Sequence, residues 1–333
     1  MQGHALTPRL VAALDTFQLH SHEWSQLPHT PKGDISQTPN YPYLSVLASG
    51  GHTLLIHSAT LTNHVILGST SDVAIGECLD KIARVVLPPE VLRNGNGTMY
   101  GALLEAFAFP DNKLAEHRST VRSDLITAQD FCVEYQSFYT YTVPRTHEEE
   151  LQRNKSNWGW AFNQPLARAN GGQKSKNLEM SFSGLMTAVE RAVRYQHDQS
   201  TGKLTKIERA PNDISLEERK DMAEFSMRAA FEHVAGRLVH ALRSTPATTV
   251  VMSGGVGANY YFRYVLSSTL CKHGFGQVRV AFPPPALCSD NAAMIAWAGT
   301  EMYQAGHCDK LNIRAIRKWP LDQLLTPPVE KTS

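Results

Sequence analysis

The sequence of 333 residues is poor in cysteine and in long hydrophobic runs. Its five cysteines show no C-x-x-C spacing and no even framework, which argues against a disulfide scaffold and favours a reducing compartment. No apolar stretch is long enough to cross a bilayer, so we expect no membrane partner. The net charge is only +1, which does not indicate a general nucleic-acid coat but is compatible with a local basic patch.

Familiar signatures of nucleotide binding and covalent catalysis are also missing. Two glycine-rich turns are present, but neither fits the dinucleotide pattern G-x-G-x-x-G or the P-loop pattern G-x-x-x-x-G-K-[ST]. No Ser/His/Asp or Cys/His set stands out, so the sequence does not point to a covalent intermediate. The composition, 42% hydrophobic and 19% charged, is that of an ordinary globular protein with room for two domains or lobes.

The first glycine-rich turn lies in residues 43–56. An apolar run leads into Ser49-Gly50-Gly51-His52-Thr53 and a second apolar run leaves it, which predicts a strand, a tight turn and a returning strand. Adjacent glycines can reach positive φ and approach a ligand closely, and the backbone N–H groups of such a turn can cradle a phosphate. An ordinary hairpin explains the same pattern, so both interpretations stay open on this stretch alone.

The second Ser-Gly-Gly turn lies at residues 253–255, after the apolar run 248–252. A helical pattern over 258–271 follows it, so this turn joins a strand to the start of a helix, which is an anion site. Two such turns on two strands suggest a nucleotide that is held from two sides. Asn259 either caps the helix or contacts that ligand.

The rest of the chain alternates strand and helix patterns, which predicts an α/β fold. The sequence begins inside a helical pattern, without an N-cap before the first turn. Ser71 is expected to cap a helix over 71–86. The aromatic and β-branched residues at 130–143 are compatible with a strand, and 179–185 predicts a strand that runs into a turn.

Three further residues are candidates for a ligand or metal site. Asp290 opens a helix after a proline-rich loop, where it or Ser289 can serve as N-cap; its functional interpretation is a metal ligand or a partner for a ligand hydroxyl. His4 gains weight as a ligand only if Asp290 faces it, and one histidine with one carboxylate still makes an incomplete site. Asp80 either forms a solvated pair with Lys81 or binds a ribose hydroxyl.

The order of these motifs, from residue 1 to about residue 321, resembles one family, the tRNA N6-adenosine threonylcarbamoyltransferases, formerly called O-sialoglycoprotein endopeptidases. The form Ser-Gly-Gly-His-Thr resembles the bacterial and mitochondrial branch, because the other branch usually has Asn in place of His. The motifs that carry the resemblance are Met1-Gln2-Gly3-His4-Ala5, Ser49-Gly50-Gly51-His52-Thr53, Gly76-Glu77-Cys78-Leu79-Asp80-Lys81, Ser181-Phe182-Ser183-Gly184-Leu185, Ser253-Gly254-Gly255-Val256-Gly257-Ala258-Asn259 and Ser289-Asp290-Asn291-Ala292-Ala293-Met294-Ile295-Ala296.

The resemblance implies an actin-like ATPase fold of the sugar-kinase type, with two lobes around a nucleotide cleft. It implies transfer of a threonylcarbamoyl group from threonylcarbamoyl-AMP to the adenosine just 3′ of the tRNA anticodon. It also implies one divalent metal ion of the Fe, Zn or Mg class, because His4 matches the second histidine of a His-x-x-x-His pair and Asp290 matches the metal-binding aspartate. The implied substrate-binding residues are Ser49, Gly50, Gly51, His52, Thr53, Asp80, Gly101 and Asn259.

The resemblance also predicts how the chain is divided. The acidic first strand and the first metal histidine of the family find no match, so we expect an N-terminally truncated chain with most of the first lobe missing and impaired transfer activity. Residues 1–40 are then a remnant of the first lobe. Residues 41–287 are the second lobe, with insertions near 110–130 and 145–178. Residues 288–325 are a helix and tail that return to the first lobe.

Location, assembly and alternative functions complete these expectations. A mitochondrial protein of fungal type is preferred, with a cytoplasmic one as the alternative, and a homodimer is expected beside tRNA and the adenylate as partners. A non-catalytic fragment that binds a nucleotide or a partner stays open. An actin-fold small-molecule kinase also stays open, but it is disfavoured because Ser-Gly-Gly-His-Thr and Ser-Asp-Asn occur together without a clear catalytic-base motif.

Overall fold

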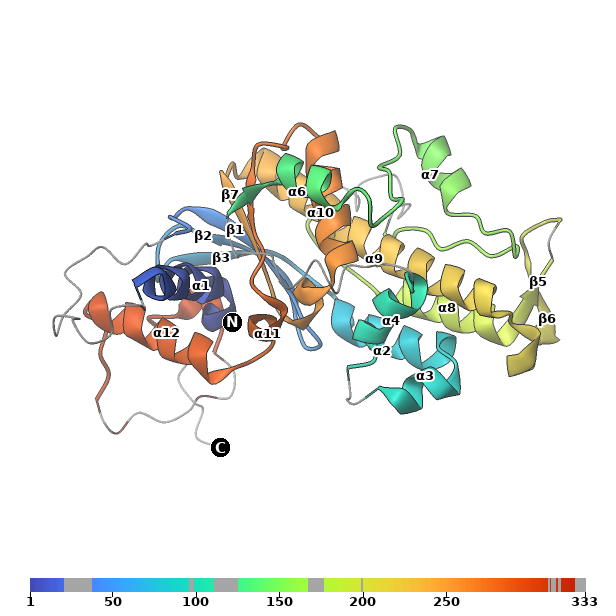
Figure 1. Ribbon diagram of the computed structural model, residues 1–333, viewed down its shortest axis with the longest axis horizontal. Helices are drawn as coiled ribbons and strands as arrows, with labels where there is room; N and C mark the ends of the chain where they lie inside the picture. The colour runs from blue at the N-terminus through green and yellow to red at the C-terminus, as the bar shows by residue number, and fades with distance from the viewer. Residues whose placement is uncertain are drawn as a thin grey trace.

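The fold is known from a computed structural model, in which a mixed sheet and a helical region lie side by side along an elongated molecule (Figure 1). No helix within the described ranges is both long and apolar enough to cross a bilayer. The structure describes residues 1–20, 38–95, 99–110, 125–166, 177–198, 200–310, 312, 316 and 319–326.

Six strands form one sheet in the order β3-β2-β1-β7-β8-β4. The first three strands form an antiparallel meander, β1 pairs in parallel with β7, β7 pairs in parallel with β8, and β4 closes the edge antiparallel to β8. The parallel pairing therefore brings together two strands that lie far apart in the sequence. The strands are β1 (Tyr43–Ala48), β2 (Thr53–Ser58), β3 (His64–Ser69), β4 (Ile126–Thr127), β7 (Thr249–Ser253) and β8 (Arg279–Ala281).

Both faces of the sheet are covered by helices, which is why β1 and β7 are buried at every position. On one face α1 packs against β7 and beside α12, and the Tyr43 hydroxyl donates to the Ala5 carbonyl at 3.1 Å. On the other face Leu44, Val46 and Met252 share a core with α9 and α10, and α6 packs on α10. These helices are α1 (Gln2–His20), α6 (Ala128–Tyr135), α9 (Leu216–Ser244), α10 (Tyr260–Lys272) and α12 (Ala292–Gln304).

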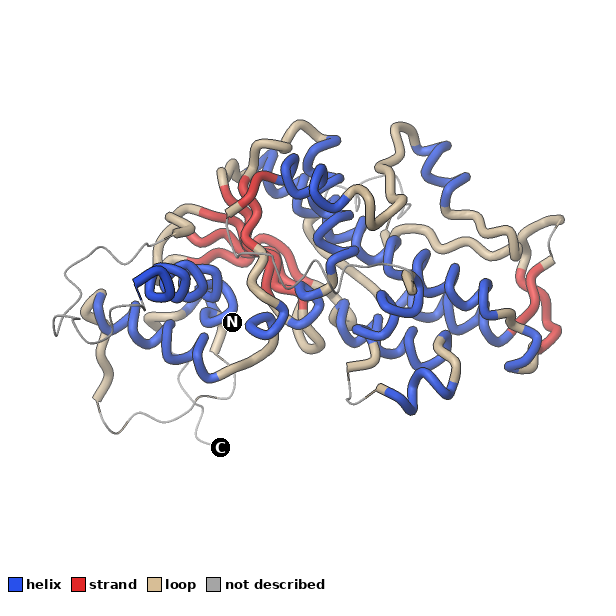
Figure 2. The backbone as a smooth tube through the Cα atoms, in the orientation of Figure 1, coloured by secondary structure: helices blue, strands red, loops and turns tan. Residues whose placement is uncertain are grey.

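The helical region lies beyond the sheet (Figure 2). The long helix α9 joins it to the core behind the sheet, because α9 contacts α10 as well as α2, α4 and α8. Ser215 caps α9 by accepting a hydrogen bond from the Glu218 N–H at 3.1 Å. The α/β class predicted from the sequence is confirmed. The remaining elements are α2 (Ile75–Val86), α3 (Pro89–Asn94), α4 (Gly101–Ala108), α7 (His147–Arg153), α8 (Ser183–Arg194), α11 (Pro285–Cys288), the hairpin β5 (Tyr195–His197) and β6 (Leu204–Glu208), and the 3₁₀ turns η4 (Pro211–Asp213), η5 (Gly255–Ala258) and η6 (Leu321–Gln323).

The helix predicted over 71–86 begins later than expected. Its first residue is Ile75, its N-cap is Ala74 without a side-chain hydrogen bond, and it ends at Val86 as predicted. The Ser71 hydroxyl instead donates to the Met180 carbonyl at 3.2 Å. The predicted Ser71 cap is therefore wrong, because contacts with a segment more than 100 residues away hold this stretch outside the helix.

Two predicted strands are also wrong. The aromatic stretch at 130–143 belongs in part to helix α6, which Thr127 caps by accepting from the Asp130 N–H at 3.1 Å, and its aromatic residues are spaced for a helix face that packs on α10. The stretch 179–185 contains a single bridge between Met180 and Thr70 before α8 begins. Of the predicted insertions, residues 111–124 and 167–176 lie outside the described residues.

Candidate functional site

The two Ser-Gly-Gly turns lie next to each other at one edge of the sheet. The parallel register pairs Leu47 with Ser253, so the turns that follow β1 and β7 leave the sheet side by side. Gly254 has a φ of 89°, and a Cβ atom there would lie 2.3 Å from the Ala48 carbonyl oxygen. Because Gly254 has no side chain, the main chain of the second turn reaches the end of β1.

The first turn is a tight hairpin. The Ser49 N–H donates to the His52 carbonyl at 2.8 Å, and β1 and β2 pair antiparallel on either side. The Ser49 hydroxyl accepts from the N–H groups of His52 at 3.0 Å and of Gly51 at 3.3 Å. The hairpin interpretation is confirmed, and a phosphate at this turn would compete with the Ser49 hydroxyl for these two donors.

Helix α2 begins directly against the first turn. The Gly76 N–H donates to the Ser49 carbonyl at 3.1 Å, and a Cβ atom on Gly76 would lie 2.7 Å from both the Ser49 carbonyl oxygen and the Gly50 nitrogen. Thr53 is fully buried, and its hydroxyl accepts from the Ile75 N–H at 2.8 Å. Thr53 thus satisfies a donor at the start of α2, whose positive dipole end faces the turn and favours an anion there.

Asn259 has a structural role at the second turn. Its side-chain oxygen accepts from the Phe262 N–H at 2.8 Å, which caps α10, and its amide lies 3.7 Å from the Met227 sulfur. The side chain is buried. Of the two roles considered for Asn259, the geometry shows the helix cap, and a ligand contact stays a prediction.

A buried guanidinium, which the sequence analysis missed, connects the second turn to the loop before Asp290. Arg263 is 2% exposed, and it donates to the carbonyl of Gly257 and to that of Pro283, both at 2.7 Å. Its charge lies over the Tyr260 ring, 4.6 Å from the centroid. A charged residue inside the otherwise apolar helical pattern over 258–271 was the only signal for this residue in the sequence.

His4 and Asp290 meet, although they lie at opposite ends of the chain. The His4 Nε2 atom is 2.8 Å from a carboxylate oxygen of Asp290, with the two side chains 10% and 96% exposed. Burial lowers the pKa of His4. The Asp290 carboxylate raises this pKa in part, and the nearby His52 lowers it further. The structure therefore brings one residue of the first turn into the electrostatic neighbourhood of the predicted metal pair.

His4 and Asp290 are the two side chains that the structure brings to the predicted metal site. The described part of the chain contains no group of three His, Cys, Asp or Glu side chains that could hold a metal ion. Asn291 caps α12 by accepting from the Met294 N–H at 2.9 Å, so the predicted cap by Ser289 or Asp290 is wrong. Because Asn291 supplies the cap, the role of Asp290 as a metal ligand or as a partner for a ligand hydroxyl stays a prediction.

Asp80 and Gly101 also lie together, one turn along α2 from the first turn. Asp80 accepts from the Tyr100 N–H at 2.9 Å and pairs with Arg84 at 3.0 Å. A Cβ atom on Gly101 would lie 3.6 Å from the Asp80 nitrogen. The predicted pair with Lys81 is wrong, because Lys81 pairs with another carboxylate of α2. A nucleotide contact by Asp80 stays a prediction.

Asp72 is a second organising residue that the sequence analysis missed. It accepts from the hydroxyls of Ser181 and Ser183, both at 2.6 Å, and from the N–H groups of Phe182 at 2.9 Å and Ser183 at 3.2 Å. Burial alone would raise the pKa of Asp72, but these donors hold it well below its ordinary value. Asp72 thereby caps α8 from a distant segment, which explains the Ser-Phe-Ser motif structurally.

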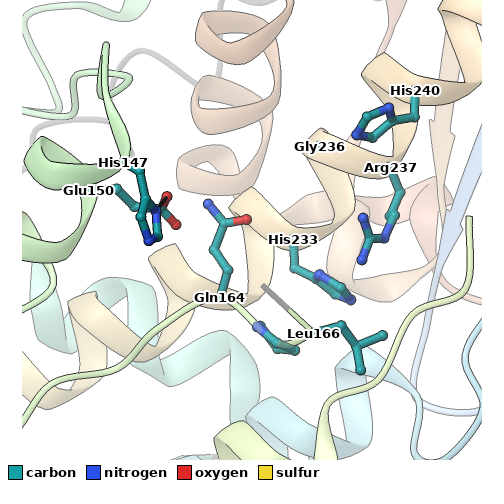
Figure 3. Close-up of a pocket in the computed structure, with 9 residues that line it drawn as sticks. His147, Glu150, Gln164, Leu166, His233, Gly236, Arg237 and His240 are labelled. Carbon is teal, nitrogen blue, oxygen red and sulfur yellow. Dashed lines mark hydrogen bonds and ion pairs between the residues drawn. The ribbon is translucent and has the colours of Figure 1, made fainter. Parts of the chain in front are cut away.

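A cavity of about 190 Å³ lies between α9 and α7 and contains none of the residues predicted from the sequence. Figure 3 shows His233, Arg237 and His240 on one side and His147 with Glu150 on the other. His233 is buried and accepts from the Ser181 N–H at 3.3 Å, which connects the cavity wall to the Ser-Phe-Ser motif. The signal for this cavity in the sequence was a set of polar residues at helical spacing within the predicted amphipathic helix.

We expect His233 to make stability depend on pH. Burial, with a smaller contribution from the Arg237 charge, lowers the pKa of His233 from 6.5 to about 3. The unfolded chain therefore binds a proton below pH 6.5 while the native chain does not, so this contribution to stability is complete above pH 6.5 and is lost as the pH falls toward 3. The loss amounts to about 2 kcal/mol at pH 5.

The measurement is the free energy of unfolding in urea at pH 8 and at pH 5. His233→Gln keeps an acceptor for Ser181 but does not titrate, so its stability should fall by about 2 kcal/mol less than that of the original chain over this range. Other histidines contribute equally to both proteins. An identical fall in the two would show that His233 is protonated in the native state.

Comparison with known proteins gives a family. The family model described as tRNA N6-adenosine threonylcarbamoyltransferase matches residues 25–169 and 145–297. A protein of Schizosaccharomyces pombe named "tRNA N6-adenosine threonylcarbamoyltransferase, mitochondrial" is 30% identical and covers 90% of the chain. Proteins with the same name, without the location, are 28% identical in Paracoccus denitrificans, over 98% of the chain, and 30% identical in Bordetella petrii, over 90% of the chain.

The chain spans about six tenths of the length of these relatives: 58% of the Schizosaccharomyces protein, 65% of the Paracoccus protein and 63% of the Bordetella protein. The two matched segments together cover most of the chain, including both Ser-Gly-Gly turns and Asp290. The mixed sheet with helices on both faces agrees with the actin-like ATPase fold of this family. The chain belongs to the tRNA N6-adenosine threonylcarbamoyltransferase family.

Proposed function

We propose that the chain acts in the synthesis of threonylcarbamoyladenosine in tRNA, by transfer of the threonylcarbamoyl group from threonylcarbamoyl-AMP to an adenosine. The observation that carries this proposal is the adjacency of the two Ser-Gly-Gly turns across the parallel β1–β7 pair, in a chain of this family. The start of α2 faces the first turn, so the positive end of a helix dipole supports an anionic ligand there.

The proposed chemistry needs no nucleophile from the protein. The N6 amine of adenosine attacks the carbamoyl carbon, the bond to the AMP phosphate breaks, and the amine proton leaves with solvent. In this proposal Ser49, Gly50, Gly51, His52 and Thr53 hold the phosphate and threonylcarbamoyl part, where main-chain N–H groups oppose the developing negative charge. The adenylate is contacted by Asp80, Gly101 and Asn259.

We further propose that His4 and Asp290 hold one divalent metal ion. An imidazole nitrogen and a carboxylate oxygen 2.8 Å apart, with Asp290 almost fully exposed, are donors that fit the Fe, Zn and Mg class. When bound, such an ion supplies Lewis-acid stabilisation of negative charge. The two side chains are held in place for that role by α1, which packs beside α12, and by the Asn291 cap next to Asp290.

The division into 1–40, 41–287 and 288–325 is also a proposal. It is supported by the packing of α1, which belongs to the first segment, beside α12, which belongs to the third (Figure 1). A mitochondrial location is supported by the name of the Schizosaccharomyces relative. We propose tRNA and threonylcarbamoyl-AMP as binding partners and a homodimer as the assembly.

The test is formation of threonylcarbamoyladenosine by this chain from tRNA and threonylcarbamoyl-AMP, measured by nucleoside chromatography with mass detection. We expect product with the original chain, and a loss of about tenfold or more in Asp290→Ala. Glu208→Gln, on the exposed β6 strand, is the matched carboxylate control and should keep its activity. No product above the reaction without enzyme would reject transfer, and retained binding of AMP in that case would favour the non-catalytic nucleotide-binding fragment.

A further inference from the structure

Two cysteines meet on the side of the molecule where α6 packs on α10. The sulfur atoms of Cys132, in the middle of α6, and Cys271, in the last turn of α10, are 3.7 Å apart, and both side chains are partly exposed. The hydroxyl of Ser268, one turn before Cys271, lies 3.6 Å from the Cys132 sulfur. Neither cysteine belongs to the site proposed for transfer.

The two helices are fixed to each other around this pair. Tyr135 of α6 packs on Tyr260 of α10 with ring centroids 5.6 Å apart, and Phe131, which precedes Cys132, packs at 4.8 Å on Phe282, which follows β8. The Gln129 N–H donates to the Gly276 carbonyl at 3.0 Å, which ties the start of α6 to the loop that follows α10. The sulfurs are therefore held close by packing on both sides, so a bond between them needs only a small approach.

We propose that Cys132 and Cys271 form a dithiol that closes reversibly to a disulfide when it meets a peroxide. The Cys271 thiolate attacks one oxygen of hydrogen peroxide, the O–O bond breaks, hydroxide leaves, and Cys271 becomes a sulfenic acid. The Cys132 sulfur then attacks the Cys271 sulfur, the S–O bond breaks, and water leaves with the thiol proton. The two sulfurs together lose two electrons, and the peroxide gains them.

The local chemistry suits this order of events. The Cys132 thiol can donate its proton to a thiolate on Cys271, and this hydrogen bond lowers the pKa of Cys271. The same interaction, with burial, raises the pKa of Cys132. The attacking group and the resolving group are therefore distinguished by their surroundings.

The other cysteines do not compete within the folded chain. Cys78 and Cys288 are buried, and burial raises the pKa of the Cys78 thiol to about 12. Cys308 is exposed, and its reaction would link one molecule to another. The background for the experiment is therefore the full chain with Cys308→Ser.

The experiment treats this background protein with hydrogen peroxide, alkylates the remaining thiols, and maps peptides by mass spectrometry without reduction. We expect a linked peptide pair that contains Cys132 and Cys271, a loss of two alkylatable thiols, and full recovery of both after dithiothreitol. The linked form should also unfold at a temperature a few degrees higher, because the bond closes a loop between residues 139 positions apart.

Cys132→Ser and Cys271→Ser in the same background are the matched variants. Each should lose the linked peptide and the rise in unfolding temperature, while circular dichroism shows that it remains folded. Recovery of all four thiols of the peroxide-treated background protein as alkylated cysteine after unfolding, with no linked peptide, would overturn the proposal. Sulfinic acid at either position without a link would overturn it as well. The proposal does not depend on transfer activity, so its failure is distinguishable from failure of the proposed function.

Discussion

Gly254→Ala is expected to lower the free energy of unfolding by about 3–5 kcal/mol. The φ of 89° at this position is a left-handed conformation that strains alanine, and the new Cβ atom would lie 2.3 Å from the Ala48 carbonyl oxygen. That contact is with backbone, so β1 and β7 must separate at the end where the two Ser-Gly-Gly turns meet. Urea unfolding followed by circular dichroism measures the loss, and transfer activity should fall with it.

Gly236→Ala is the matched control for Gly254→Ala. Gly236 lies inside α9 beside the cavity, and a Cβ atom there has nothing within 4 Å. The same substitution should raise stability by up to about 1 kcal/mol, because alanine favours a helix interior. Equal effects of the two substitutions would show that the close approach of Gly254 to Ala48 does not exist in solution.

The second large effect is expected at Arg263. Arg263→Met keeps much of the side-chain length but removes the donors to the Gly257 and Pro283 carbonyls. Two buried acceptors then lose a charged partner, which should cost about 3–5 kcal/mol of unfolding free energy. Because Pro283 begins the loop toward Asp290, metal affinity at the proposed His4–Asp290 pair should also fall, and isothermal titration with a divalent metal measures it.

Arg194→Met is the control for this substitution. Arg194 pairs with Glu208 on the surface at 3.3 Å, with the two side chains 63% and 65% exposed, and its loss should change stability by less than about 0.5 kcal/mol. Arg263→Lys should be intermediate, since one ammonium group cannot reproduce the fork of two donors. A loss below about 1 kcal/mol for Arg263→Met would mean that water replaces the guanidinium at both carbonyls.

The two glycine turns of the site could be predicted from the sequence, because local residue types determine a strand that ends in a tight turn. Apolar runs that end in Ser-Gly-Gly identified both turns, and the chain order of the motifs identified the family. The meeting of His4 with Asp290 was predicted as well, because the resemblance assigned both to one metal. Hydrophobic periodicity also predicted the bounds of α9 and α10 closely, because long amphipathic patterns are strong signals of a helix.

What failed depended on contacts between distant segments. Ser71 looked like a helix cap, but Asp72 and Ser71 bond to residues 180–183, and no local pattern announces such a partner. The aromatic residues at 130–143 looked like a strand because β-branched and aromatic types favour strands, and only the partner helix α10 shows that Phe131 and Tyr135 lie on a helix. Arg263 was overlooked because a charge in a helix is ordinarily assigned to the surface.

Helix α9 has a mechanical consequence for the whole molecule. It is 29 residues long, about 44 Å at 1.5 Å per residue, and most of its positions are buried. It contacts α10 behind the sheet and α2, α4 and α8 in the helical region. A helix that is packed into both regions couples the unfolding of the core behind the sheet to that of α2, α4 and α8, whereas the largely exposed hairpin of β5 and β6 can open locally.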